Sequence, residues 1–225
     1  MTGDEMRERN IALMGEALGK QYSELFREVT VLHLYWNEYV ELFGTSDERI
    51  ARLNQTAPGF FLMLQEQLFE ANMLHLARLT DRSVSLGKSN LTIQSLPDLV
   101  SDPALKIQLT TLVDDVKHKT EFCRDWRNRR LAHHDLLLAM KDAQAKPLED
   151  ATKEKIAAAL RALSDLLNAM ERFYYKNVCS FEDTMAHHGV GTLLFYLGHG
   201  IKGRERMMER FNQRDFSALD VPEPV

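Results

Sequence analysis

The segment that decides the fold is Asp125-Trp126-Arg127-Asn128-Arg129-Arg130-Leu131-Ala132-His133-His134-Asp135, which follows a long stretch of apolar residues at helical spacing. Counting back from its first arginine in steps of three and four gives one face of an amphipathic helix: Cys123, Thr120, Val116, Leu112 and Leu109. Arg127 therefore occupies a position at which this pattern expects a core residue. Because a guanidinium near a core is costly unless it is paired, Arg127 requires a carboxylate, a phosphate or a carbonyl opposite it.

The second notable side chain of this segment is His133, which lies six residues after Arg127, near the predicted end of the helix. On a straight helix that turns by about 100° per residue, side chains six positions apart point about 120° apart. Arg127 and His133 therefore converge only if the helix ends between them or if a second chain completes the site.

The rest of the chain has helical periodicity and no convincing strand alternation. The expected helices cover about residues 4–43, 47–55, 58–81, 103–131, 152–177 and 190–211. Gly15 and Gly19 weaken the first of these, which can also form two collinear helices, and Gly198, Gly200 and Gly203 interrupt the last. The pattern predicts an all-α fold, a single bundle of about five to seven helices.

Composition limits the class of protein. A chain of 225 residues with 44% hydrophobic residues supports one domain over residues 1–218, and residues 219–225, with two prolines, are expected to be a disordered tail. A net charge of −5 excludes a protein coated in basic surface, so any contact with RNA requires a local patch. Two cysteines predict neither a disulfide scaffold nor a zinc site, and we expect no metal and no cofactor. The charged N-terminus and the lack of a long apolar run predict a cytoplasmic protein without a membrane segment.

The order of several motifs resembles a known family. The motif resembles the Arg-to-His motif of HEPN domains: it has Arg127-Asn128, five residues between Arg127 and His133, Ala132 directly before the histidine, and a following aspartate. Three further segments resemble the AbiU-like branch of that superfamily, which is associated with abortive phage infection: Pro58-Gly59-Phe60-Phe61, Ala77-Arg78-Leu79-Thr80-Asp81 and Asn90-Leu91-Thr92-Ile93. The resemblance extends from roughly Tyr39 to Leu197. It implies a HEPN-like helical bundle and a homodimeric, metal-independent endoribonuclease that acts as a toxin or an anti-phage effector.

In that activity the catalytic candidates are Arg127 and His133. An RNA 2′-hydroxyl attacks its own 3′-phosphate to give a 2′,3′-cyclic phosphate, and negative charge builds on the nonbridging oxygens. Histidine moves protons near neutral pH, and arginine offers a planar, permanently charged fork to those oxygens. One chain supplies one such imidazole, whereas a symmetric dimer with both motifs at its axis supplies two.

Three neighbours are supporting candidates. The resemblance assigns to Asn128 a role in positioning the phosphate or the histidine. Asp135 either orients an imidazole or caps the segment that follows it. His134 is also a candidate, although Ala132-His133 matches the family better. HEPN toxins that are inactivated by nucleotidyl transfer have a tyrosine where this chain has Asp135, so control by that modification is not expected.

Four more arginines are candidates for RNA binding: Arg124, Arg129, Arg130 and Arg82. A simpler interpretation is that the arginines of the motif complement the negative C-terminal end of the helix dipole. In the same interpretation, Asp125 and Arg129, four residues apart, form an ordinary surface ion pair.

Asp81 follows the helix that is rich in phenylalanine. It either lines the same groove as the motif or forms an ion pair with Arg78 at a spacing of three, and we favour the ion pair. The sequence leaves two alternatives to the enzyme. One is a non-catalytic helical module that binds RNA or a protein through the same basic patch, and the other is a structural dimer bridged by arginines. A regulatory partner or antitoxin is compatible with the enzyme.

Overall fold

A computed structural model describes residues 2–85, 87–133 and 135–215 of the chain. His134 and the predicted tail at 219–225 therefore lie outside the described residues. Two compact units are present: the first contains residues 1–37 and 67–184, and the second contains residues 38–66 and 185–225.

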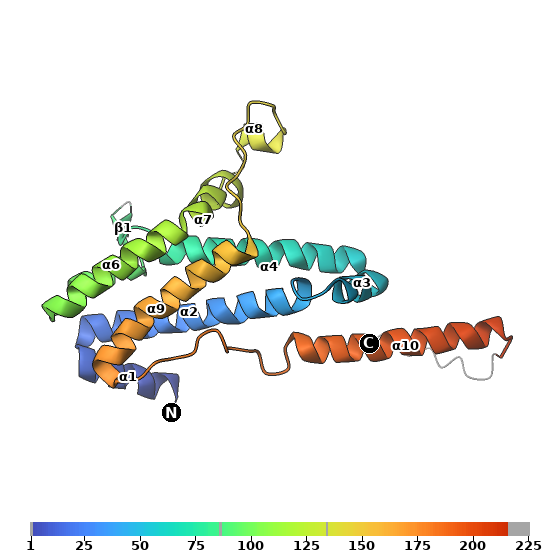
Figure 1. Ribbon diagram of the computed structural model, residues 1–225, viewed down its shortest axis with the longest axis horizontal. Helices are drawn as coiled ribbons and strands as arrows, with labels where there is room; N and C mark the ends of the chain where they lie inside the picture. The colour runs from blue at the N-terminus through green and yellow to red at the C-terminus, as the bar shows by residue number, and fades with distance from the viewer. Residues whose placement is uncertain (1, 86, 134, 216–225) are drawn as a thin grey trace. The chain divides into compact units, whose positions relative to one another are not determined.

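The helices are α1 (Gly3–Met14), α2 (Glu16–Phe43), α3 (Asp47–Thr56), α4 (Pro58–Leu79), α5 (Leu96–Leu99), α6 (Pro103–Lys119), α7 (Glu121–Trp126), α8 (Leu136–Ala139), α9 (Lys153–Tyr175) and α10 (Val190–Asn212) (Figure 1). A 3-10 turn, η1 (Ile93–Ser95), a π-helical turn, η2 (Arg127–Leu131), and a small antiparallel hairpin of β1 (Val84–Ser85) and β2 (Lys88–Ser89) complete the described elements. The all-α class is confirmed. Among the described residues, six α-helices have twelve residues or more, and the others have ten or fewer. They differ from the six predicted helices, because residues 4–43 form two long helices and the predicted helix at 47–55 is the short α3.

Two helix starts follow directly from the sequence. The Asp102 carboxylate accepts a hydrogen bond from the backbone N–H of Leu105 at 2.8 Å and thereby caps α6. The Thr152 hydroxyl accepts one from the N–H of Lys155 at 3.3 Å and caps α9. Both helices begin where these residues predict, and they pack side by side in the first unit (Figure 1).

The first predicted helix is two helices, but they are not collinear. Gly15, with φ of +85°, turns the chain between α1 and α2. A Cβ added to Gly19 would lie 2.6 Å from the Cα of Ile11. Residues eight apart on one straight helix are about 12 Å apart, so α1 folds back onto the start of α2. Gly19 is the residue that permits this close approach.

Four of the five residues of the predicted stripe are buried. Leu109, Val116, Thr120 and Cys123 are all at most 1% exposed, whereas Leu112 is only partly buried. Burial raises the pKa of the Cys123 thiol to about 12, so this thiol is a protonated core group. The single helix predicted at 103–131 is instead divided into α6, α7 and η2, and the first break falls at Thr120.

The second unit has its own small core. It consists of Leu42, Leu53, Phe61, Val190 and Leu194. The carboxylate of Glu38 accepts the N–H of Val190 at 2.6 Å, which supplies an anion to the N-terminus of α10. The three glycines of α10 do not interrupt it, because the helix is continuous from Val190 to Asn212.

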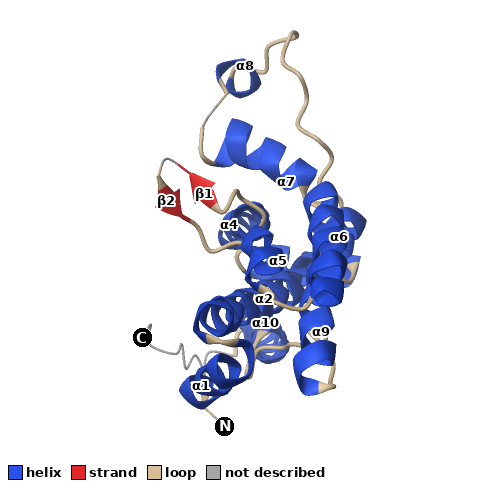
Figure 2. Cartoon of the chain, turned by 90° about the vertical axis from the view of Figure 1, so that its left-hand side faces the viewer, coloured by secondary structure: helices blue, strands red, loops and turns tan. Residues whose placement is uncertain are grey.

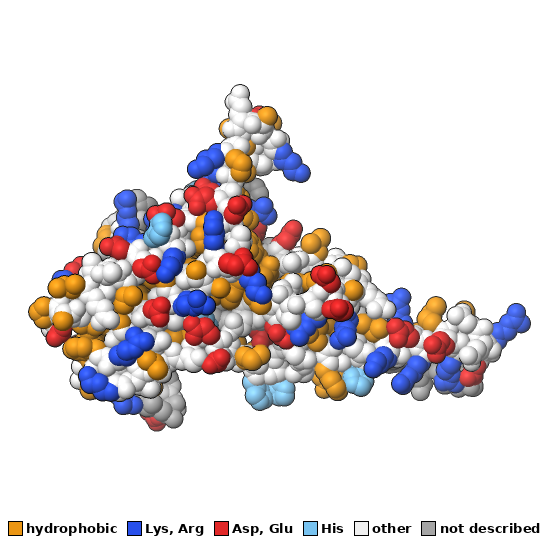
Figure 3. Space-filling view, viewed as in Figure 1, with side chains coloured by type: hydrophobic (Ala, Val, Ile, Leu, Met, Phe, Trp, Pro, Cys, Tyr) orange, Lys and Arg blue, Asp and Glu red, His pale blue; other side chains and the backbone are white. Residues whose placement is uncertain are grey.

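The surface over α6 and α9 mixes acidic and basic side chains, as Figure 3 shows. This mixture fits a net charge of −5 without a large field of one sign. Over the described residues, no helix is both long and apolar enough to serve as a membrane span.

Candidate functional site

Arg127 lies at the start of the π-helical turn η2. The N–H of Ala132 donates to the carbonyl of Arg127, five residues earlier, at 2.8 Å. Such wide turns are rare and are frequent at functional sites. The helix ends at Leu131, so it ends between Arg127 and His133, which is one of the two conditions under which these side chains can converge. His133 itself is exposed, and it makes no hydrogen bond or ion pair with another described residue.

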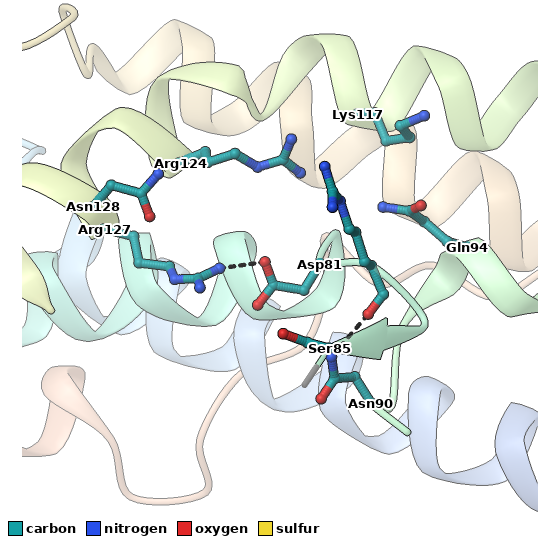
Figure 4. A pocket seen from close by; sticks show the side chains of 9 residues that line it. Asp81, Ser85, Asn90, Gln94, Lys117, Arg124, Arg127 and Asn128 are labelled. Atoms are coloured by element: carbon teal, nitrogen blue, oxygen red, sulfur yellow. Dashed lines mark hydrogen bonds and ion pairs between the residues drawn. The ribbon is translucent and has the colours of Figure 1, made fainter. Parts of the chain in front are cut away.

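The carboxylate that Arg127 requires comes from Asp81. The Arg127 Nη1 donates to Asp81 Oδ1 in an ion pair that Figure 4 shows as a dashed line. The Arg127 side chain is 31% exposed and that of Asp81 is 26% exposed, so a ligand can reach both. The ion pair predicted between Asp81 and Arg78 is wrong, because the turn after α4 directs this carboxylate toward η2 instead.

Side chains from elsewhere in the first unit fix the position of Asp81. The Thr92 hydroxyl lies 2.7 Å from the carbonyl oxygen of Asp81. The carbonyl of Thr80 accepts from Gln94 Nε2 at 2.7 Å and from Arg124 Nη2 at 3.0 Å. These bonds satisfy carbonyls that the end of α4 leaves without helical partners. The turn that carries Asp81 is therefore held by residues on two different segments, the capped turn η1 and the helix α7.

The ion pair borders a pocket of about 670 Å³. Its lining residues are Asp81, Arg82, Ser85, Asn90, Gln94, Lys117, Arg124, Arg127 and Asn128 (Figure 4). Four of them are cations and one is a carboxylate, in a chain whose net charge is −5. The structure thus gathers an excess of positive charge locally, as contact with RNA requires.

The pocket combines predicted residues with others that the sequence analysis missed. Arg82, Arg124, Arg127 and Asn128 line it as a group, whereas His133 is not part of its wall. Lys117 was missed, although it lies seven residues before Arg124 and eleven before Asn128, a spacing that places three side chains on one helix face. No sequence signal connects Ser85, Asn90 and Gln94 to this face, because only the return of the chain after α4 brings them there.

Arg129 lies outside this pocket and binds the backbone. Its Nη1 donates to the carbonyl of Pro147 at 3.2 Å, and its Nη2 donates to the carbonyl of Lys146. The predicted ion pair with Asp125 is present at 3.5 Å, and both side chains are less than 20% exposed. Arg129 therefore connects η2 to the returning end of residues 135–152, a segment that we call the arm.

Two further bonds secure the arm, which projects beyond α7 and carries α8 (Figure 2). The N–H of Glu149 donates to Asp125 Oδ2 at 3.0 Å, and Trp126 Nε1 donates to the carbonyl of Glu149 at 2.8 Å. At the other end, Asp135 caps α8 by accepting the N–H of Leu138 at 3.2 Å. This bond, supported by Arg129, lowers the pKa of the Asp135 carboxyl. Of the two roles considered for Asp135, the cap is present.

Arg130 points to a different group of side chains. Its Nε donates to Glu70 Oε1 at 3.0 Å, and its guanidinium carbon lies 5.5 Å from the centre of the Trp126 ring. The Trp126 ring in turn contacts Phe69 edge-on, with ring centres 5.3 Å apart. Because the Arg130 side chain is 48% exposed, its predicted contact with RNA is sterically open and stays a prediction.

Replacing Arg129 with alanine is expected to release the arm from η2. The carbonyls of Lys146 and Pro147 lose their donors, so we expect protease cleavage within residues 136–148 to be about tenfold faster, corresponding to about 1.4 kcal/mol of local opening free energy. The measurement is limited proteolysis with mass-spectrometric mapping. Arg130→Ala removes the same charge one residue away and should leave this rate unchanged. Equal cleavage of both variants and the wild type would show that Arg129 does not hold the arm.

The fold and the motif together define a helical domain with an arginine in a basic pocket and a histidine just past the helix end. A family model described as AbiU2, of the HEPN superfamily, matches residues 15–188, which include this entire arrangement. The chain belongs to the AbiU2 family of HEPN domains, an abortive-infection-related group. No curated protein and no solved structure gives a significant match to the chain.

Proposed function

We propose that this protein is a metal-independent endoribonuclease of abortive infection, and that it acts as a homodimer in the cytoplasm. Arg127 and His133 from both copies form the composite site, and RNA is the substrate. A toxin of this kind requires restraint, so an antitoxin or another regulatory partner belongs to the proposal.

The observation that carries the proposal is the environment of Arg127. Its guanidinium is oriented by Asp81 at the edge of a pocket with three more cations: Arg82, Lys117 and Arg124. The pair with Asp81 uses one of the five N–H donors of arginine, so the others are available to phosphate oxygens. A preorganised guanidinium stabilises the charge that develops on the phosphorane oxygens more effectively than water does.

The reaction needs two proton transfers. One His133 imidazole removes the proton of the 2′-hydroxyl while the 2′-oxygen forms a bond to phosphorus. The bond between phosphorus and the 5′-oxygen breaks, and the second imidazole protonates the departing oxygen. The products are a 2′,3′-cyclic phosphate and a 5′-hydroxyl. Each chain supplies one His133, so a dimer in which the two motifs face each other provides both groups.

The test is RNA cleavage by the purified protein in EDTA. We expect wild-type protein to produce 2′,3′-cyclic phosphate ends, identified by mass spectrometry, and His133→Ala to cut about a hundredfold more slowly. Exposed His118, in the same unit, provides a matched control, because His118→Ala should cut at the wild-type rate. Intact RNA after incubation with the wild type, across varied substrates, would refute the proposal. So would equal cleavage by His133→Ala.

One observation favours a second function, a non-catalytic module that binds RNA or a protein. No described side chain orients the His133 imidazole, because Asp135 is bound to Leu138 and Arg129 instead. In the enzyme, a group of the second copy must fill that role. The module instead predicts salt-sensitive RNA binding without cleavage, weakened by loss of Arg124, Arg129 and Arg130 and unaffected by His133→Ala.

A further inference from the structure

The basic pocket is larger than one phosphate needs. Its volume of about 670 Å³ falls in the range of about 300–1,000 Å³ that is usual for small-molecule sites. Arg127 lies at one border, and the pocket continues past Asp81 to the hairpin and to α6 (Figure 4). If a scissile phosphate binds Arg127, the remaining space faces the adjoining part of the same strand.

The walls of this space carry further cations besides Arg127. Arg82 and Lys117 contribute positive charge. Arg82 forms no ion pair with another described residue, and the pair of Lys117 with Asp114 is an exposed one at 3.2 Å that water and salt weaken. Both cations are therefore available to a phosphate without the loss of a buried partner.

Three amide side chains also line the pocket, and two of them are held in place. Gln94 Nε2 donates to the carbonyl of Thr80 at 2.7 Å, and Asn90 Nδ2 donates to the carbonyl of Arg82 at 2.8 Å. The side-chain oxygens of Gln94 and Asn90 remain as acceptors. Asn128 makes no hydrogen bond to another described residue through its amide. Fixed amides beside cations suit a base edge next to a phosphate, because amides can donate to and accept from bases.

We propose that this pocket is a subsite for one nucleotide that flanks the scissile phosphate. Arg82 and Lys117 bind the phosphate of that nucleotide, and Gln94, Asn90 and Asn128 contact its base. The ligand class is a nucleoside phosphate, either within an RNA strand or free. The segments that flank the hairpin, which carry Arg82 and Asn90, thereby contribute to the selection of the substrate. The position of the nucleotide relative to the cut rests on the proposed function, whereas its binding does not.

The experiment measures binding separately from cleavage. Fluorescence anisotropy of a labelled hexaribonucleotide is recorded with His133→Ala protein, in which the strand stays intact, over a series of salt concentrations. Arg82→Ala with Lys117→Ala should weaken binding at least tenfold. It should also reduce the slope of log affinity against log salt by about 0.7 for each lost phosphate contact. Lys88→Ala with Lys106→Ala is the matched control, because it removes the same charge from the hairpin that follows Arg82 and from α6, the helix that carries Lys117, outside the pocket lining. The control should retain wild-type affinity.

Two further measurements identify the ligand. The four nucleoside monophosphates are tested as competitors, and a subsite that takes free nucleotides predicts competition that the pocket variant lacks. Gln94→Ala and Asn90→Ala should change the order of preference among hexamers that differ at one base, with unchanged salt slopes. Thermal unfolding shows which variants remain folded. If the double variant at Arg82 and Lys117 does not, the single variants Arg82→Gln and Lys117→Gln take its place.

Equal loss of affinity in the pocket variant and the matched control would overturn the subsite, because it would reduce the pocket to general electrostatic attraction. Wild-type affinity in the pocket variant would do the same. These outcomes are independent of catalysis: a protein that binds RNA through the pocket and never cuts it refutes the nuclease and leaves the subsite in place.

Discussion

Arg127→Ala is expected to reduce RNA cleavage by about a thousandfold, the upper range for loss of one donor that stabilises transition-state charge. The reason is that this guanidinium is the cation that Asp81 orients at the pocket edge. Alanine also leaves the Asp81 carboxylate, 26% exposed, without its partner, at a cost to stability of about 1–2 kcal/mol. The measurements are single-turnover cleavage in EDTA and urea unfolding.

A second substitution separates the two effects. Arg127→Ala with Asp81→Asn removes the unpaired charge, so stability should return to within about 0.5 kcal/mol of the wild type while cleavage stays low. Arg127→Lys keeps a charge but not the planar fork, and it should recover little activity. If Asp81→Asn restored cleavage to Arg127→Ala, the guanidinium would have a structural role only. RNA cleavage by Arg127→Ala at the wild-type rate would exclude Arg127 from the reaction.

Gly19→Ala is expected to destabilise the first unit by about 1–3 kcal/mol or more, as overpacking does. The added methyl group would lie 2.6 Å from the Cα and N atoms of Ile11 and 2.7 Å from the carbonyl carbon of Asn10. These are backbone atoms, so no side chain can rotate away, and α1 must separate from α2. The measurement is urea unfolding followed by circular dichroism.

The control for Gly19→Ala is a glycine on α1, the helix that Gly19 contacts. Gly3 is the first residue of α1, and an added Cβ there meets no atom within 4 Å. Gly3→Ala should therefore change stability by less than about 0.5 kcal/mol. Equal stability of Gly19→Ala and Gly3→Ala would mean that the close contact between α1 and α2 does not exist in solution.

The sequence located the border of the site better than its interior. The apolar stripe that ends at Arg127 predicted a buried face and a guanidinium that needs an anion, and both are present. It could not choose Asp81 over other carboxylates, because that choice depends on how the chain turns after α4. The residues that hold this turn, Thr92 and Gln94, carry no local signal of that function.

The sequence anticipated a break near Gly15, but it did not locate the other helix interruptions. Glycines predicted a break in α10, but the helix is continuous. A glycine in a helix interior costs about 1 kcal/mol relative to alanine and keeps its backbone N–H donor, so it weakens a helix without interrupting the hydrogen bonds. The predicted single helix before the motif is broken at Thr120 and widened at Arg127, where no glycine or proline signals a change. Local propensity is a weak term, and tertiary contacts outweigh it at these positions.

The sequence alone determined that this chain is a helical HEPN domain of the AbiU2 family, with an arginine that requires an anionic partner and a histidine near a helix end. The family follows from the resemblance of the ordered motifs and from the family model. Periodicity and short-range spacing carry the helical class and the positions of these two side chains, because they depend only on neighbours along one helix. The tertiary structure decided which carboxylate meets Arg127, that Arg129 binds the arm, and that Lys117, Ser85 and Asn90 join the basic pocket. Those contacts join residues far apart in the chain, so they are set by packing rather than by any local pattern.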